Sequence, residues 1–172
     1  MPPNQNIVIM KNIFLVAAFL FSATAMAQVY SGKGDQKFQV GADFQSGATG
    51  VQATYDYGVG ENISFGLTAA YALGIDEEVS VDFDERAMLR LRFNANIGNV
   101  INIDPKLDVY PGLGFSTKNF GGHLGARYFF TDGFGLYTEM AVPFAKYKTE
   151  ELTQAEELYN QFTVSLGMSF NF

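Results

Sequence analysis

The strongest constraint on the fold of this chain is a two-residue alternation of side-chain character. The C-terminal segment shows it best: from Phe162 to Phe172 every second residue is apolar, and the residues between them are small or polar. Successive side chains of a β-strand point to opposite sides of a sheet, so the pattern predicts a strand with one apolar and one polar face. The apolar stripe comprises Phe162, Val164, Leu166, Met168, Phe170 and Phe172.

Seven earlier segments alternate in the same way. Turn-rich stretches separate several of them, for example Gly60–Asn62 and Thr131–Gly133. In every segment one face carries no charge, and the charged residues share the other face. A helical period is visible only weakly, over Glu150–Leu158. We therefore predict eight strands, over residues 37–44, 51–59, 63–73, 87–97, 107–115, 123–130, 136–142 and 162–172.

The N-terminal residues predict export. Lys11 precedes an unbroken apolar run, Ile13–Phe21, and small residues follow it up to Ala27. This order is that of a secretory signal peptide, with Ala25 and Ala27 at the cleavage site and Met10 as the expected true start. We expect a leader over residues 1–27 and a single mature domain over residues 28–172.

Alternation alone leaves three architectures open: a secreted sandwich, a soluble lipocalin-like barrel and a membrane barrel. A charge-free face can be buried either in a protein core or in lipid. The signal's apolar run is too short to span a bilayer, and no later segment reaches the eighteen or so apolar residues of a membrane helix. A membrane-spanning protein without such helices must be a closed barrel. The absence of cysteine excludes a lipid-anchored cysteine, disulfides and a thiolate metal site.

The unit Gly121–Glu139 and the terminal strand ending on Phe172 resemble small Gram-negative outer-membrane barrels, the eight-stranded family typified by outer membrane protein A. The resemblance covers the mature region. It implies an all-β, antiparallel, up-and-down transmembrane barrel with short periplasmic turns and longer outer loops at Gly74–Glu85 and Phe144–Tyr159. It also implies that the terminal stripe is an insertion signal read by the barrel insertion machinery. Outer-membrane lipid and lipopolysaccharide are the expected surroundings, and the expected state is a monomer.

The polar face then turns inward and carries both signs of charge. Charges inside a narrow barrel must be paired or hydrated, and side chains can just fill an eight-stranded interior. We expect a salt-bridge network that plugs the lumen, with Arg127 and Glu139 as partners across the hairpin at Asp132; a polar conduit is the alternative. The expected members are Asp43, Asp56, Arg90, Arg92, Asp108, His123, Arg127 and Glu139.

Three further features are less regular. Gly98–Lys106 is long for a periplasmic turn, and Pro111 would remove a ladder hydrogen bond, so we expect a bulge or a frayed strand end there. An outer loop gathers carboxylates that can bind divalent cations and so meet lipopolysaccharide, but it lacks the glycine and spacing of an EF-hand. A solvated acidic loop is therefore the expectation for Asp76, Glu77, Glu78, Asp82, Asp84 and Glu85.

Function is the least constrained property. A net charge of −7 argues against nucleic acid as a partner. His123 is the single histidine and has no evident serine and acid beside it, so we predict no catalytic, cofactor-binding or metal-binding residues. The favoured hypothesis is a non-enzymatic outer-membrane barrel with a structural or surface-interaction role. The alternatives are a narrow diffusion channel, a lipid-modifying enzyme and a soluble secreted lipocalin-like barrel.

Overall fold

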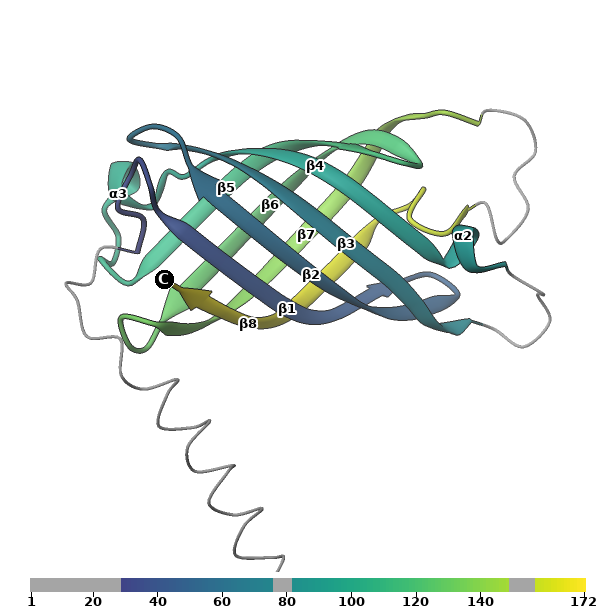
Figure 1. Ribbon diagram of the computed structural model, residues 1–172, viewed down its shortest axis with the longest axis horizontal. Helices are drawn as coiled ribbons and strands as arrows, with labels where there is room; N and C mark the ends of the chain where they lie inside the picture. Colours follow the sequence, from purple (N-terminus) through teal and green to yellow (C-terminus); the bar gives the residue numbers. More distant parts are fainter. Residues whose placement is uncertain (1–28, 76–81, 149–156) are drawn as a thin grey trace, which may run out of the picture.

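The computed structural model describes residues 29–75, 82–148 and 157–172, and it shows a closed barrel of eight tilted antiparallel strands (Figure 1). Each strand pairs with the next along the chain, and the last pairs with the first, so the predicted up-and-down fold is confirmed. The elements are β1 (Gln36–Gln45), β2 (Ala48–Gly58), β3 (Ile63–Ile75), α2 (Phe83–Arg86), β4 (Ala87–Ala95), α3 (Gly98–Ile101), β5 (Leu107–Ser116), β6 (Asn119–Phe129), β7 (Phe134–Lys146) and β8 (Thr163–Asn171).

The two ends of the barrel differ. One end, here called the terminal end, carries the C-terminus, the segment before β1, α3 and the short β2–β3 and β6–β7 turns (Figure 1). The opposite end, the loop end, carries α2 and the long β3–β4 and β7–β8 connections. This is the predicted distribution of short and long connections. The two four-residue helices were not predicted, because a single turn is too short for a helical period to emerge from the sequence.

The wall of the barrel separates polar from apolar side chains by alternation. The inward residues include fully buried polar groups such as Thr54, Asn94 and Ser169. The outward residues include exposed large apolar side chains on every strand, among them Leu67, Leu91 and Leu166. The predicted assignment of faces is confirmed for all eight strands. Within the described residues, no helix has the length and apolar character that crossing a membrane would require.

The β4–β5 ladder is the shortest of the eight. It has five registered pairs, from Arg90–Ser116 to Asn94–Gly112, whereas the other ladders have eight to eleven. The ladder stops beside Pro111, which has no N–H to donate. Farther on, the backbone N–H of Ile97 donates to the carbonyl of Val109 at 2.8 Å. The frayed strand end expected at Pro111 is thus present on its β4 side.

Candidate functional site

A network of ion pairs occupies the middle of the barrel interior. Arg92 on β4 binds Glu139 on β7 through both guanidinium Nη atoms, at 2.7 and 3.3 Å. Arg127 on β6 lies 2.8 Å from Asp108 on β5 and 3.3 Å from Asp56 on β2. Asp56 joins the two halves, since its Oδ1 lies 3.2 Å from Arg92 Nε, within ion-pair distance though outside hydrogen-bond geometry. All five side chains are at most 4% exposed, and we call them the lumen network.

The lumen network crosses the interior as well as running along the wall. In the closed order of eight strands, β2 and β6 are four positions apart and therefore lie on opposite walls. The Arg127–Asp56 pair joins these two walls. The Arg92–Glu139 pair joins β4 to β7, which are three positions apart. Long guanidinium side chains suit such links, because their planar fork binds carboxylates bidentately at a distance from their own strand.

Tyr110 lies at the centre of the lumen network. Its ring centroid is 4.6 Å from the guanidinium carbon of Arg127 and 5.5 Å from that of Arg92, which are cation–π distances. Its hydroxyl accepts a hydrogen bond from Gln39 Nε2 at 3.1 Å. Gly125 on the neighbouring strand faces the ring, and a β-carbon there would collide with it. Alternation had placed Tyr110 inward, but nothing in the sequence marked its position between two arginines.

The predicted partnership of Arg127 and Glu139 is wrong. The β6–β7 register places Arg127 opposite Tyr137 and Glu139 opposite Gly125, so the two charged residues are only diagonal neighbours. Arg127 pairs instead with Asp108, directly opposite it on β5, and with Asp56 across the interior, and Glu139 pairs with Arg92 across the interior. The interior is narrow enough for these long side chains to find partners on distant strands, which hairpin spacing cannot reveal.

The other three predicted members flank the lumen network. His123 Nε2 lies 2.7 Å from Asn94 Oδ1, and its ring is buried. Asp43 is buried and accepts a hydrogen bond from Ser165 at 2.7 Å. Arg90 is half-buried, and no ion pair joins it to another side chain in the part of the chain that the structure describes. The structure therefore places all eight predicted residues on the inner face and joins five of them.

A short segment before β1 occupies the mouth at the terminal end. The hydroxyl of Tyr30 donates to the carbonyl of Gly60 at 3.1 Å and also to that of Ile63. Lys37, fully buried, pairs with Asp35 and donates to Asn171 Oδ1 at 2.8 Å. Burial, together with the Asp35 carboxylate, raises the pKa of Tyr30 to about 12. This segment has no periodicity, so no sequence pattern indicated its position.

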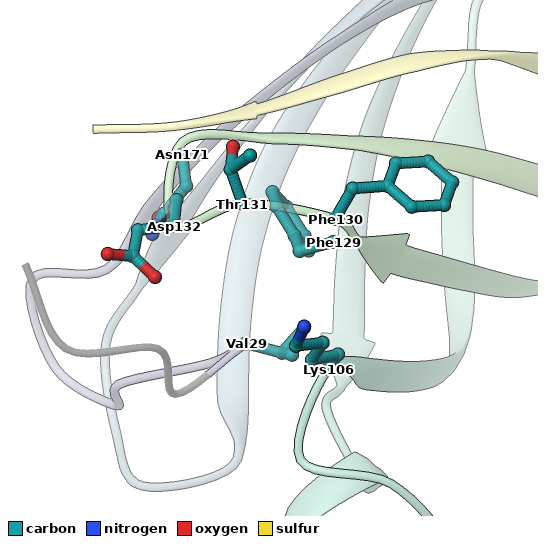
Figure 2. Close-up of a pocket in the computed structure, with 7 residues that line it drawn as sticks. All are labelled: Val29, Lys106, Phe129, Phe130, Thr131, Asp132 and Asn171. Carbon is teal, nitrogen blue, oxygen red and sulfur yellow. Dashed lines mark hydrogen bonds between the residues drawn. The ribbon is translucent and has the colours of Figure 1, made fainter. Parts of the chain in front are cut away.

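A small cavity opens beside that segment. It measures about 60 Å³, and Figure 2 shows its lining, in which Val29 and Lys106 face Phe129 and Asn171. The ring of Phe130 points away from the cavity in the same view, toward the outer surface of the barrel. The volume is enough for a few water molecules and too small for an organic ligand.

The segment before β8 occupies the mouth at the loop end. Leu158 and Tyr159 are buried against small residues of β2 and β3 and against Met88 of β4. Tyr159 has a positive φ of 64°, its N–H donates to Gln45 Oε1 at 2.7 Å, and its carbonyl accepts from Asn119 Nδ2 at 2.6 Å. Burial raises the pKa of Tyr159 above its ordinary value. The backbone bonds hold the phenol over the interior.

Several predicted sites lie wholly or partly outside the described residues. These include the signal segment 1–27 with Ala25 and Ala27, the loop residues Asp76, Glu77 and Glu78, and most of the weak helical pattern at 150–158. Of the remaining loop acids, Glu85 accepts a hydrogen bond from the Asp82 N–H at 3.2 Å, and Asp84 is exposed in α2. Within residues 29–75, 82–148 and 157–172, no cluster of three or more His, Cys, Asp or Glu side chains is arranged to hold a metal ion.

The predicted insertion stripe on β8 points outward. Phe162, Leu166, Met168 and Phe172 are exposed, and Val164 and Phe170 are half-buried against neighbouring strands. Phe170 stacks against Phe38 across the β1–β8 seam, with ring centroids 6.5 Å apart. The position of the stripe agrees with the predicted face, and its recognition by an insertion machinery stays a prediction.

Comparison with known sequences places the chain in a family. A model described as a family of unknown function (DUF6646) matches residues 19–172. The chain belongs to DUF6646. No curated protein gives a significant match to it. Membership in DUF6646 assigns no activity, and the predicted kinship with outer membrane protein A stays a prediction.

Comparison with solved structures supports the fold. A structure titled "De novo design of transmembrane beta-barrels" superposes with a TM-score of 0.57 at 12% identity, over 83% of this chain and 99% of that chain. The crystal structure of the N-terminal β-barrel domain of Pseudomonas aeruginosa OprF gives a TM-score of 0.54 at 13% identity, over 83% of this chain and 100% of that one. At these identities the likeness extends to the fold of this DUF6646 chain and no further.

Proposed function

We propose that this protein is a non-enzymatic integral outer-membrane barrel with a closed lumen, which serves as a rigid scaffold for its loop end at the cell surface. The observation that carries the proposal is the lumen network, because its Arg127–Asp56 pair connects opposite walls of the barrel. An ion pair between opposite walls obstructs an axial path at that level. A barrel that does not conduct leaves a structural or surface-interaction role as the favoured hypothesis.

Membrane embedding is supported by the polarity of the wall. Large apolar side chains on all eight strands are exposed, whereas the charged residues of the strands are almost all inside. A soluble lipocalin-like barrel has the opposite arrangement, because water on its outside favours polar residues there. A transmembrane barrel alternates apolar residues outward and polar residues inward. The protein is therefore expected in the membrane fraction after a carbonate wash, and its recovery in the supernatant would contradict embedding.

Closure is supported at three levels along the axis. The segment around Tyr30 covers the mouth at the terminal end, and the lumen network with Tyr110 fills the middle. The segment around Tyr159 covers the mouth at the loop end. Paired charges and hydrogen-bonded mouths leave few groups to line an aqueous path, so a plugged barrel fits better than a narrow diffusion channel.

Conductance across planar bilayers tests closure. Purified wild-type protein is expected to give no discrete openings. A variant with Tyr110, Arg92 and Arg127 replaced by alanine removes the central obstruction and is expected to pass ions at least intermittently. Leu91→Ala, on the lipid-facing side of β4, is the matched control and should stay silent. Folding of each variant is checked by the mobility shift of a folded barrel on an unheated gel.

Two results would contradict the proposal. Reproducible wild-type openings that change when Arg127 is replaced would indicate a channel. Silence of the folded triple variant would show that the lumen network is not what closes the barrel. Lipopolysaccharide and divalent cations remain the proposed partners of the outer surface, and the barrel insertion machinery the proposed reader of the stripe ending at Phe172.

A further inference from the structure

The connection between β4 and β5 has two chemically different sides. Gly98, Asn99 and Asn102 line a cavity of about 200 Å³ together with Tyr30 of the terminal mouth. The other side carries Val100, Ile101 and Ile103, which are 64%, 41% and 74% exposed. Ile103 and Val100 are among the most exposed aliphatic side chains of the described residues, and all three residues lie beyond the ends of the strands. Apolar groups gathered on one side of an ordered turn indicate a surface that something apolar covers.

The apolar side of this connection continues the outer wall of the barrel. Ile97, two residues past the end of β4, continues the outward row of Leu91 and Phe93. Val100 and Ile101 come three and four residues after Ile97, so the helical turn of α3 keeps them on the same side. Ile97, Val100 and Ile101 therefore extend the apolar outer row of β4 onto α3.

Hydrogen bonds fix the orientation of the connection. The Gly98 N–H donates to Asp108 Oδ1 at 3.3 Å, and the Asn99 amide donates to Asn62 Oδ1 at 2.7 Å. The Asn102 N–H closes the turn on the Gly98 carbonyl at 3.0 Å. Because the polar side is held against the mouth of the barrel, the apolar side must face outward. The exposure of Ile103 is thus a consequence of the fold and not of a loose end.

Aromatic residues mark the same level of the barrel. Phe65, Tyr128 and Phe130 are exposed on the outer surface near the terminal end. Aromatic side chains concentrate where a membrane meets water, since their rings are apolar and tolerate the headgroup region. A connection that starts at this level and extends the apolar surface farther is placed to enter the headgroup region itself.

We propose that α3 and Ile103 form a lipid-binding foot, which lies in the headgroup region of the leaflet at the terminal end and anchors the barrel beside its shortest ladder. This inference rests on the proposed membrane embedding. It adds a second lipid contact, formed by a connection and not by the wall. Its occupant is phospholipid, and a periplasmic protein at the same surface is the competing outcome.

The chain contains no tryptophan, so a single introduced tryptophan reports on one position without background. Four variants are reconstituted into phosphatidylcholine vesicles with and without brominated acyl chains. Ile103→Trp and Val100→Trp probe the foot, and Leu91→Trp probes the wall. Lys33→Trp, at an exposed position of the segment over the terminal mouth, is the matched control in water. All four positions lie on the surface or the lipid face, and gel mobility verifies folding.

The expected result is a graded set of spectra. The tryptophan fluorescence of Leu91→Trp should be quenched strongly by brominated lipid. The fluorescence of the two foot variants should be quenched, and their emission should be blue-shifted relative to that of Lys33→Trp. The fluorescence of Lys33→Trp should be unaffected. If Leu91→Trp is quenched while both foot variants behave as Lys33→Trp does, the foot is refuted and the embedded barrel stands. If no variant is quenched, membrane embedding fails and the foot fails with it.

Discussion

Replacement of Arg127 by methionine tests whether the interior is a sealed, dehydrated network or a hydrated conduit. Methionine keeps much of the length of the side chain and removes the charge. The change leaves Asp108 without its guanidinium partner, whereas Asp56 keeps Arg92 within 3.2 Å. Removing one partner of a buried ion pair costs about 3–5 kcal/mol, because the remaining charge is buried without compensation. A pair in water is worth only about 0–1 kcal/mol.

A second substitution isolates the cause. Asp108→Asn in the Arg127→Met background removes the uncompensated carboxylate, so we expect it to restore about 1–3 kcal/mol. The same Asp108→Asn change in the wild-type background should destabilise, since it breaks the pair from the other side. The two effects have opposite signs, so their magnitudes add in the double-mutant cycle, and the coupling energy should exceed the recovery of about 1–3 kcal/mol.

Urea titration of the barrel folded in detergent micelles measures these differences. Far-UV circular dichroism follows the loss of strand, and linear extrapolation of the unfolding free energy compares the four proteins. A cost of less than about 1 kcal/mol for Arg127→Met, with no recovery on adding Asp108→Asn, would refute the reasoning. The charges would then be hydrated, and the interior would be open to water.

Three further outcomes are expected. Gly125→Ala should lower the free energy of unfolding by about 1–3 kcal/mol, because its β-carbon would collide with the ring of Tyr110. Ala126→Val, on the outward face of the same strand, should change it little, and equal effects of the two substitutions would contradict this packing. Since the pKa of Tyr30 is raised to about 12, its contribution to the free energy of unfolding should be intact below pH 10 and fall as the pH rises through 12. The free energy of unfolding of Tyr30→Phe should lack that part of the decline when it is compared with the wild type over the same pH range. His123→Ala should leave lipid A acylation unchanged on overexpression and cost about 1 kcal/mol through the lost bond to Asn94; altered acylation in the wild type that this variant abolishes would indicate an enzyme.

The two-residue alternation of side chains was enough to predict most of the fold. A strand has a period of two whatever its neighbours are, so the inward position of Arg92 and the outward position of Leu91 could be predicted one strand at a time. The turn at Asp132 located the β6–β7 hairpin but did not give its pairing, since Arg127 lies opposite Tyr137, two residues from the predicted partner Glu139. These properties are local, and local sequence encodes them.

The connections of the lumen network that cross the interior could not be predicted, because they depend on distance across the barrel. Asp108 lies opposite Arg127 in the β5–β6 ladder, whereas the contact of Arg127 with Asp56 depends on the curvature and tilt of strands separated widely in the sequence. Tyr110 was missed for the same reason, since its position between two guanidinium groups exists only after closure. The mouth segments around Tyr30 and Tyr159 are irregular backbone, each held by hydrogen bonds to distant parts of the chain, and no periodicity in the sequence indicates them.

The seam between β1 and β8 has a consequence for the order in which this protein is made. Nine registered pairs, from Lys37–Asn171 to Gln45–Thr163, join the first and the last strand of the barrel. Until β8 arrives, β1 and β7 each have an edge of unpaired backbone groups, which hydrocarbon cannot satisfy. A chain that lacks β8 therefore has no stable inserted state in a bilayer. For the membrane barrel proposed above, the wall can therefore close only after β8 has been made and has paired with β1.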